Sequence, residues 1–441
     1  MSSHAFATEG LDRCPFMPVF GAPQVMFERG SGTELWDTAG NRYLDFLCGL
    51  AVTSLGHANP VIAAAVAEQA STLLHVSNLF ANRVATDAAV ALNALLPETT
   101  GEAGQVFFCN SGAEANEAAL KLARKFGGRG RHGVVSAFGS FHGRTLASLA
   151  ATGQPAKHEP FQPMPDGFRH VVFNDIAALE AAIDPSVSAV LLETVQGEGG
   201  VLPAEVEYLR AVRALCDERG LLLMIDEVQT GFARTGQWFG FQHAGIVPDV
   251  VTMAKGMGNG FPVGAVWAKR SVAGVFQPGD HGSTYSGTAI ATAVVAAVIS
   301  EMRRLDAPAL AEQRGAERID PHRQFRMLSR ENINRVTAHA ESAARKIHFI
   351  AGVLHLNQAS DDVTLADFVF GTQRQNHFVV FAGITDTVDR GHRRHNHHVA
   401  SFHQRFGAGQ THLLDMFIDR RIFLNEQVAL WHIGFRLVVI V

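Results

Sequence analysis

Short continuous apolar runs alternate with longer segments of helical periodicity through the middle of the chain. The apolar runs lie at 105–109, 134–137, 170–173, 189–193, 221–225, 250–254 and 263–268, and helical stretches such as 113–126 and 205–219 lie between them. Strands that are apolar at every position are typical of a mostly parallel sheet covered by helices on both faces. The pattern therefore predicts an α/β fold with a mostly parallel, seven-stranded sheet.

The segments around this core follow other patterns. Residues 24–45 alternate in polarity around Gly30-Ser-Gly32 and Ala39-Gly-Asn41, which predicts short antiparallel strands joined by hairpin turns. Residues 60–73, 84–96 and 289–304 have the period of helices. We therefore expect three parts: an N-terminal segment with a hairpin at 1–59, a large domain at 60–305 and a C-terminal region at 306–441.

The C-terminal region differs in character from the rest. Twelve of the 21 histidines lie between His322 and His432, and no proline follows Pro321. The helical pattern fades, so the region is atypical and does not predict a well-folded domain. A metal site is one interpretation, but His395-x-His397-His398 has no matching carboxylate pattern. We therefore expect no metal, and a shifted reading frame near Glu317 is the interpretation we prefer.

Composition narrows the function classes. The chain has 441 residues, a net charge of −5 and 18% charged residues, which gives no electrostatic basis for binding nucleic acid. No apolar run reaches the ~18–20 residues of a membrane span, and the N-terminus lacks the pattern of a secretory signal. Four scattered cysteines suit reduced thiols. We expect a cytoplasmic enzyme of small molecules, with neither a membrane nor a nucleic-acid partner.

Two charged residues stand at predicted strand ends. Asp226 directly follows the run 221–225. Lys255 directly follows the run 250–254 and precedes several glycines. Ligands of open α/β sheets bind where strands end, so the carboxylate is well placed for chemistry, although a helix cap or a turn aspartate is an equally good interpretation of Asp226 alone. A desolvated lysine with a lowered pKa can form a Schiff base.

Two further motifs join strands to helices. Ser111 and Glu114 form a capping-box pattern around Gly112, where free backbone amides can bind a phosphate. An ordinary capped helix without a ligand has the same sequence pattern. Phe141-His-Gly-Arg144 offers an aromatic face and a guanidinium that can hold a carboxylate. Together, the lysine, the acid, the amides and the ring describe a pyridoxal 5'-phosphate site.

The order of these motifs resembles the class III aminotransferases, which are fold-type I pyridoxal phosphate enzymes. The motifs are Ser111–Asn116, Phe141–Arg144, Gln196–Glu198, Asp226–Gln229, Lys255-Gly256 and His281–Thr284, and the resemblance covers about residues 18–314. His75–Phe80 is similar to the members of the class that act on N-acetylornithine. The resemblance implies a large domain with the sheet, plus a small domain built from both ends of the chain.

The resemblance also implies roles in cofactor binding. Lys255 would form the Schiff base and later move a proton between the substrate Cα and C4′ of the cofactor. Asp226 would keep the pyridine nitrogen protonated. Val228 and Phe141 would cover the two ring faces, and Gln229 would reach the phenolic oxygen.

Phosphate and substrate would be held by other residues. Ser111, Gly112 and Ala113 would bind the phosphate, and Thr284 would do so from the neighbouring subunit, which implies a homodimer with shared sites. Arg144 would hold a substrate carboxylate, with Ser283 of the neighbouring subunit close by.

Glu198 resembles a glutamate that shields an active-site arginine during one half-reaction. That arginine normally lies in an Arg-Leu-x-Pro-Pro-like segment near the C-terminus. The most similar segment of this sequence is Arg436-Leu437, which lacks the prolines. We therefore expect Glu198 to lack its usual counter-charge. The expected activity is transfer of the δ-amino group of N-acetylornithine to 2-oxoglutarate in arginine biosynthesis. The alternatives are an aminotransferase of ornithine, 4-aminobutyrate or succinyldiaminopimelate, or a relative that binds cofactor but is inactive.

Overall fold

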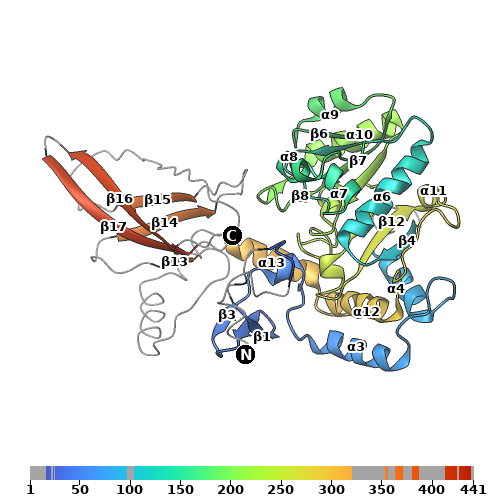
Figure 1. The fold of residues 1–441 in the computed structure, drawn as a ribbon, viewed down its shortest axis with the longest axis horizontal. Coiled ribbons are helices and arrows are strands. Elements are labelled where there is room, and N and C mark those ends of the chain that lie inside the picture. Colours follow the sequence, from blue (N-terminus) through green and yellow to red (C-terminus); the bar gives the residue numbers. More distant parts are fainter. Residues whose placement is uncertain are drawn as a thin grey trace. The chain divides into compact units, whose positions relative to one another are not determined.

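The computed structural model describes residues 16–20, 23, 25–96 and 104–319, together with five strands between residues 353 and 438 (Figure 1). Its contacts divide the chain into two units, residues 48–339 and residues 1–47 with 340–441. The expected division at residues 59 and 305 stays a prediction.

A seven-stranded sheet organises the larger unit, in the order β4-β12-β11-β10-β7-β5-β6. Its strands are β4 (Gly104–Cys109), β5 (Gly133–Ala137), β6 (Phe168–Val171), β7 (Val187–Glu193), β10 (Leu222–Asp226), β11 (Val250–Met253) and β12 (Gly264–Lys269). The pairs among β6, β5, β7, β10 and β11 are parallel, whereas β12 is antiparallel to both β11 and β4. All seven predicted apolar runs are therefore strands of one mostly parallel sheet, as expected.

Most positions of the strands are apolar because both faces of the sheet are buried. In β10, Leu223 and Ile225 belong to one core, which also contains residues of α10 (Val206–Arg219) and α12 (Ala289–Arg304). Leu222 and Met224 belong to the opposite core, which contains the buried alanines of α6 (Gly112–Gly127). Successive strand side chains point to opposite faces, so each face receives half of the apolar residues. Each such fully buried side chain contributes about 1.5–3 kcal/mol to the free energy of folding.

Helices connect the strands and cover them (Figure 1). Ser111 caps the N-terminus of α6, and Gly128 at φ +72° ends it, because glycine enters this left-handed region without a Cβ clash. The other helices are α2 (Cys48–Ala51), α3 (Pro60–Thr72), α4 (Arg83–Asn93), α7 (Leu146–Ala151), α8 (Pro155–His158), α9 (Ile176–Ala182), α11 (Arg270–Ala273) and α13 (Ala307–Ile319). A short hairpin of β8 (Val195–Gln196) and β9 (Leu202–Pro203) follows β7. No helix in the described ranges is long and apolar enough to span a membrane.

The smaller unit contains the predicted hairpins. Strands β1 (Phe27–Ser31), β2 (Glu34–Asp37) and β3 (Arg42–Leu44) form an antiparallel meander. The Asp37 carboxylate accepts hydrogen bonds from the amides of Ala39 and Asn41, which fixes the second turn. The C-terminal strands are β13 (Val353–His355), β14 (Val363–Phe370), β15 (Val380–Asp386), β16 (Leu413–Leu424) and β17 (Gln427–Val438). Arg436-Leu437 lies in β17, and the histidine cluster at 392–398 lies outside the described residues.

Candidate active site

A cavity of about 370 Å³ lies at the carboxyl edge of the sheet. Its walls come from the loops after β4, β5, β7, β10 and β11, which is where ligands of open α/β sheets bind. Ten of the twelve predicted site residues line it: Ser111, Gly112, Ala113, Phe141, Arg144, Glu198, Asp226, Val228, Gln229 and Lys255. The structure thus brings together motifs that are spread over 145 positions of the sequence.

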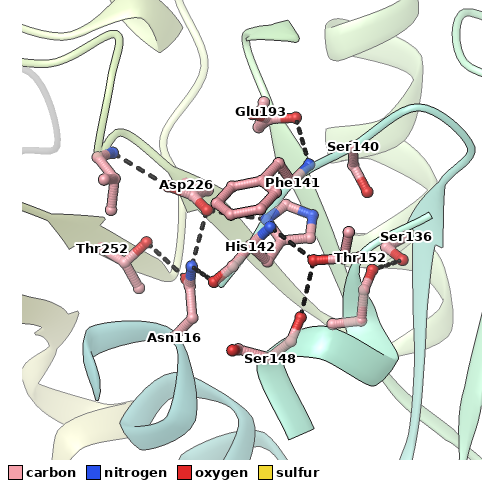
Figure 2. A network of polar contacts seen from close by, with 12 residues as sticks. Asn116, Ser136, Ser140, Phe141, His142, Ser148, Thr152, Glu193, Asp226 and Thr252 are labelled. Carbon is pink, nitrogen blue, oxygen red and sulfur yellow. Dashed lines mark hydrogen bonds and ion pairs between the residues drawn. The ribbon is translucent and has the colours of Figure 1, made fainter. Parts of the chain in front are cut away.

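Asp226 lies at the centre of a buried hydrogen-bond network (Figure 2). Its Oδ2 accepts bonds from His142 Nδ1 and Asn116 Nδ2, both at 2.8 Å. Its Oδ1 accepts a bond from the Val228 amide at 3.0 Å. These three contacts fix the orientation of a carboxylate that is only 4% exposed. Asp226 is therefore a carboxylate held in a fixed orientation in the cavity wall; it caps no helix, although its bond from the Val228 amide is that of a turn aspartate.

His142 and Asn116 support this carboxylate, and the sequence analysis assigned neither of them a role. His142 is buried, its amide donates to Thr152 Oγ1 at 2.9 Å, and its Nε2 has no hydrogen-bond partner among the described residues. Asn116 Nδ2 also donates to the His142 carbonyl, and Asn116 Oδ1 accepts from Thr252 Oγ1 at 2.9 Å (Figure 2). Both residues belong to motifs on which the resemblance to the aminotransferases rests, so the sequence did indicate that they lie near the site.

Lys255 begins a 3₁₀ turn directly after β11 and lies at φ +40°, a strained conformation for a side-chain-bearing residue. Burial lowers the pKa of Lys255 below its usual value, although Asp226, Glu193 and Glu198 act in the opposite direction. A lowered pKa increases the fraction of neutral amine, the form that attacks a carbonyl. The side chain therefore meets the electrostatic requirement of the predicted nucleophile.

Glu193 is a second carboxyl group in the cavity wall. It ends β7 in register with Asp226 on β10, and its Oε2 accepts a bond from the Phe141 amide at 3.3 Å (Figure 2). Burial, and next the charge of Asp226, raise the pKa of Glu193 well above its usual value. The sequence analysis placed Glu193 inside an apolar run and missed it as a site residue.

The N-terminus of α6 forms one wall of the cavity. Ser111 Oγ accepts a bond from the Glu114 amide at 3.2 Å, as expected for a cap, but Glu114 accepts from the amide of Asn110 rather than from that of Ser111. The reciprocal half of the predicted capping box is thus shifted by one residue. A Cβ on Gly112 would lie 2.8 Å from Val228 Cγ1, so only glycine lets the backbone approach so closely. The first amides of a helix lack acceptors within it, and those of Gly112 and Ala113 border the cavity.

Charged residues also surround the ring of Phe141. Arg144 Cζ lies 5.4 Å from the ring centroid. The expectation that Glu198 lacks its usual counter-charge, an arginine near the C-terminus, stays a prediction, but Glu198 has another cation beside it, because its Oε2 lies 2.7 Å from Lys157 Nζ. That expectation considered only an arginine near the C-terminus, whereas the cation comes from α8, 41 positions before Glu198.

Two predicted residues do not line the cavity. Ser283 Oγ accepts a bond from Asn110 Nδ2 at 2.9 Å, and Thr284 is exposed. In the described part of the chain, no group of three His, Cys, Asp or Glu side chains could hold a metal ion.

These features fit pyridoxal 5'-phosphate. The cavity is lined by the amine of Lys255 with its lowered pKa, by the fixed carboxylate of Asp226 and by the ring of Phe141. It is also lined by the N-terminus of α6, where Gly112 has no side chain to cover the backbone amides. Together with the order of the sheet, they define a fold-type I pyridoxal phosphate enzyme.

Comparison with known proteins leads to the family. The family model for class III aminotransferases matches residues 19–321. Acetylornithine aminotransferase of Caldanaerobacter subterraneus subsp. tengcongensis is 48% identical over 293 residues, which are 65% of this chain and 73% of the relative. The corresponding protein of Gloeobacter violaceus is 49% identical over 305 residues, 68% of this chain and 75% of the relative. Ornithine aminotransferase of Toxoplasma gondii superposes with a TM-score of 0.65 at 33% identity, covering 69% of this chain and 73% of that chain. The chain belongs to the class III aminotransferases, and its cofactor is pyridoxal 5'-phosphate.

Proposed function

We propose that this enzyme transfers the δ-amino group of N-acetylornithine to 2-oxoglutarate, a step of arginine biosynthesis. The observation that carries the proposal is the 48–49% identity to two acetylornithine aminotransferases over 293 and 305 residues. The family match at residues 19–321 contains the cavity. The ornithine aminotransferase similarity is weaker at 33% identity, so ornithine is the less favoured donor.

The cofactor would be held by residues of four loops. Lys255 would hold it covalently through Nζ, and the amides of Gly112 and Ala113, with Ser111, would bind its phosphate. Asp226 would pair with its ring nitrogen, because a carboxylate held in place by three hydrogen bonds can stabilise a protonated partner. Val228 and Phe141 would cover the ring faces, and Gln229 would bind the phenolic oxygen.

Bound pyridoxal 5'-phosphate supplies an electron sink that weakens a C–H bond of the substrate beside the reacting nitrogen. Lys255, once its amine is free, would take that proton and return it at a different carbon. Its lowered pKa suits both steps, since a general base works best with a pKa near the working pH. Arg144 would bind a substrate carboxylate and orient the reacting carbon toward Lys255.

The proposed assembly is a cytoplasmic homodimer in which Thr284 completes the phosphate site of the neighbouring subunit. Thr284 is exposed and lies outside the cavity lining of its own chain. Leu79, Phe80 and Tyr285 are 87%, 70% and 62% exposed, and large exposed apolar side chains are typical of a contact surface. Among the described residues, Cys109 and Cys216 are free thiols, which suits a reducing compartment.

Spectroscopy and kinetics on the purified holoenzyme test the proposal. N-acetylornithine should bleach the visible absorbance of the cofactor, and 2-oxoglutarate should restore it. The value of kcat/KM should be highest for N-acetylornithine among ornithine, 4-aminobutyrate and succinyldiaminopimelate. A higher value for one of these three donors would reassign the substrate.

An inactive, cofactor-binding relative is the second candidate. The family match supports this candidate, because it ends at residue 321 and does not include the C-terminal region, where the family's substrate-binding arginine would be expected. Stable visible absorbance that no amine bleaches would identify this case.

A further inference from the structure

Two buried carboxyl groups lie side by side at the edge of the sheet that forms the cavity. Glu193 ends β7 and is the register partner of Asp226, which ends β10. Neighbouring strands are about 4.8 Å apart, and the side chains of register partners point to the same face. The two residues are only 7% and 4% exposed, and both line the cavity. Two negative charges held so close together and away from water would repel each other strongly.

Hydrogen bonds are distributed unequally over the two carboxyl groups. Asp226 takes part in three, which hold both of its oxygens. In the described ranges, the one donor to Glu193 is the Phe141 amide, at a long 3.3 Å (Figure 2). A buried charge needs hydrogen-bond partners to replace the water that it has lost. One long hydrogen bond is weak support for a negative charge on Glu193.

The charged groups around Glu193 act mostly in the same direction. Burial is the largest cause that raises the pKa of Glu193, and the charge of Asp226 is the second. The charge of Glu198 also raises it, whereas the Phe141 amide and the charge of Lys255 lower it. The cavity lining contains two more ionisable residues, which are His142 and Arg144.

The hydrogen bond to Glu193 completes the support of the loop after β5. Ser140 and His142, on either side of Phe141, are both bonded to residues 152–154. The amide between them donates to Glu193 instead (Figure 2). A backbone amide that is shielded from water needs an acceptor, so Glu193 fixes the backbone at the residue whose ring lines the cavity.

The charge of Glu193 would also act on Lys255. Burial lowers the pKa of Lys255, and the charges of Asp226 and then of Glu193 act in the opposite direction. A proton on Glu193 removes the second of these opposing charges, so more of the lysine amine is neutral. The neutral amine is the form that attacks a carbonyl.

We propose that Glu193 is an uncharged carboxylic acid in the resting enzyme, and that it is a positioning residue, which holds Phe141 without placing a second negative charge beside Lys255. A protonated carboxyl group can still accept the Phe141 amide through its other oxygen. The inference concerns the cavity wall, so it holds whichever amine is the donor substrate.

Infrared difference spectroscopy of the holoenzyme tests the protonation state. The C=O stretch of a protonated carboxyl group is separate from the bands of a carboxylate. At about pH 8, the difference between wild type and Glu193→Gln should contain this C=O stretch, because the pKa of Glu193 is raised well above its usual value. Carboxylate bands alone in this difference would overturn the inference.

Glu227→Gln is the matched control. Glu227 is also a buried carboxyl group, but it accepts three hydrogen bonds and lies outside the cavity lining. Its pKa is about 7, so most Glu227 side chains are ionised at about pH 8. The difference between wild type and Glu227→Gln should therefore contain carboxylate bands.

A pH titration of the cofactor's visible absorbance tests the effect on Lys255. The band changes when the nitrogen that joins Lys255 to the cofactor loses its proton. Glu193→Gln should leave the midpoint within about 0.3 pH units of wild type, because one neutral group replaces another. If Glu193 were charged, its removal would lower the midpoint by about one unit, and this result would overturn the inference.

Glu193→Leu tests the positioning role, because leucine cannot accept the Phe141 amide. It should change the circular dichroism of the visible band, which reports the arrangement of side chains around the cofactor. Glu193→Gln keeps an acceptor and should keep the wild-type signal. A wild-type signal in Glu193→Leu would overturn the positioning role. Melting temperatures report folding, and Glu193→Gln still decides the charge if the leucine variant does not fold.

Discussion

Replacing Asp226 by asparagine separates the charge of this side chain from its shape. The amide fits the same space, but it cannot carry the negative charge that stabilises a protonated ring nitrogen. Removing one partner of a buried charge pair costs about 3–5 kcal/mol. If this cost appears in the transition state, the rate falls by about two to three and a half orders of magnitude, at ~1.4 kcal/mol per factor of ten.

The same substitution should also destabilise the fold, but less. Asp226 Oδ2 accepts from His142 and Asn116, and Oδ1 accepts from the Val228 amide. In either orientation, the new NH₂ group faces at least one donor. One buried donor without an acceptor costs about 1–3 kcal/mol of unfolding free energy. Phosphate contacts should keep the cofactor bound.

Stopped-flow absorbance under single-turnover conditions with N-acetylornithine measures the rate of the chemical step directly. Asp249→Asn is the control, because Asp249 is also buried and bonded to Arg213, Lys269 and the Leu223 amide, but lies outside the cavity lining. It should lower the melting temperature and leave the half-reaction within threefold of wild type. A half-reaction of Asp226→Asn within threefold of wild type, or an equal loss in both variants, would refute the assigned role.

Three further predictions follow from the cavity and its surroundings. Lys255→Ala should reduce transamination by at least about three orders of magnitude, because the sequence-nearest candidate Lys269 pairs with Asp249 at 3.0 Å; activity near wild type would contradict the assignment. Gly112→Ala should weaken cofactor affinity, since overpacking against Val228 costs about 1–3 kcal/mol, and Val228→Ala should partly restore it in a titration with pyridoxal 5'-phosphate. Burial raises the pKa of Glu227 from 4.5 to about 7, so the folded protein binds more protons than the unfolded chain between these values. Its contribution to the free energy of unfolding is therefore largest below pH 4.5 and is lost as the pH rises through about 7, by roughly 3 kcal/mol. Urea unfolding of Glu227→Gln should show a smaller loss of stability between pH 4.5 and about 7 than the wild type. An equal loss in both proteins would show that Glu227 does not cause it.

Continuous apolar runs were sufficient to predict the seven strands, because burial on both faces leaves few polar positions in a strand. The strand ends then located Asp226 and Lys255, since parallel strands place their carboxyl ends at one edge. Sequence motifs alone could not show that His142 and Asn116 meet Asp226, because these contacts span 84 and 110 positions.

Lys157 shows a different limit of sequence reasoning. Nothing in the sequence of α8 marks Lys157, and only the fold brings it to Glu198 and to the ring of Phe141. The search for a counter-charge followed the pattern of the family and looked near the C-terminus. An ion pair has no sequence spacing of its own when its partners lie on different elements.

The position of β4 at the edge of the sheet has a consequence for the order of synthesis. β4 leads into the turn that carries Ser111 and Gly112, and its neighbour in the sheet is β12, about 155 residues later in the chain. During translation, this strand therefore waits unpaired until residue 269 has left the ribosome, and closing so long a loop is slow. If this turn binds the cofactor phosphate as proposed, the cofactor cannot template the early folding of the enzyme, because the turn is anchored only after all seven strands have been made.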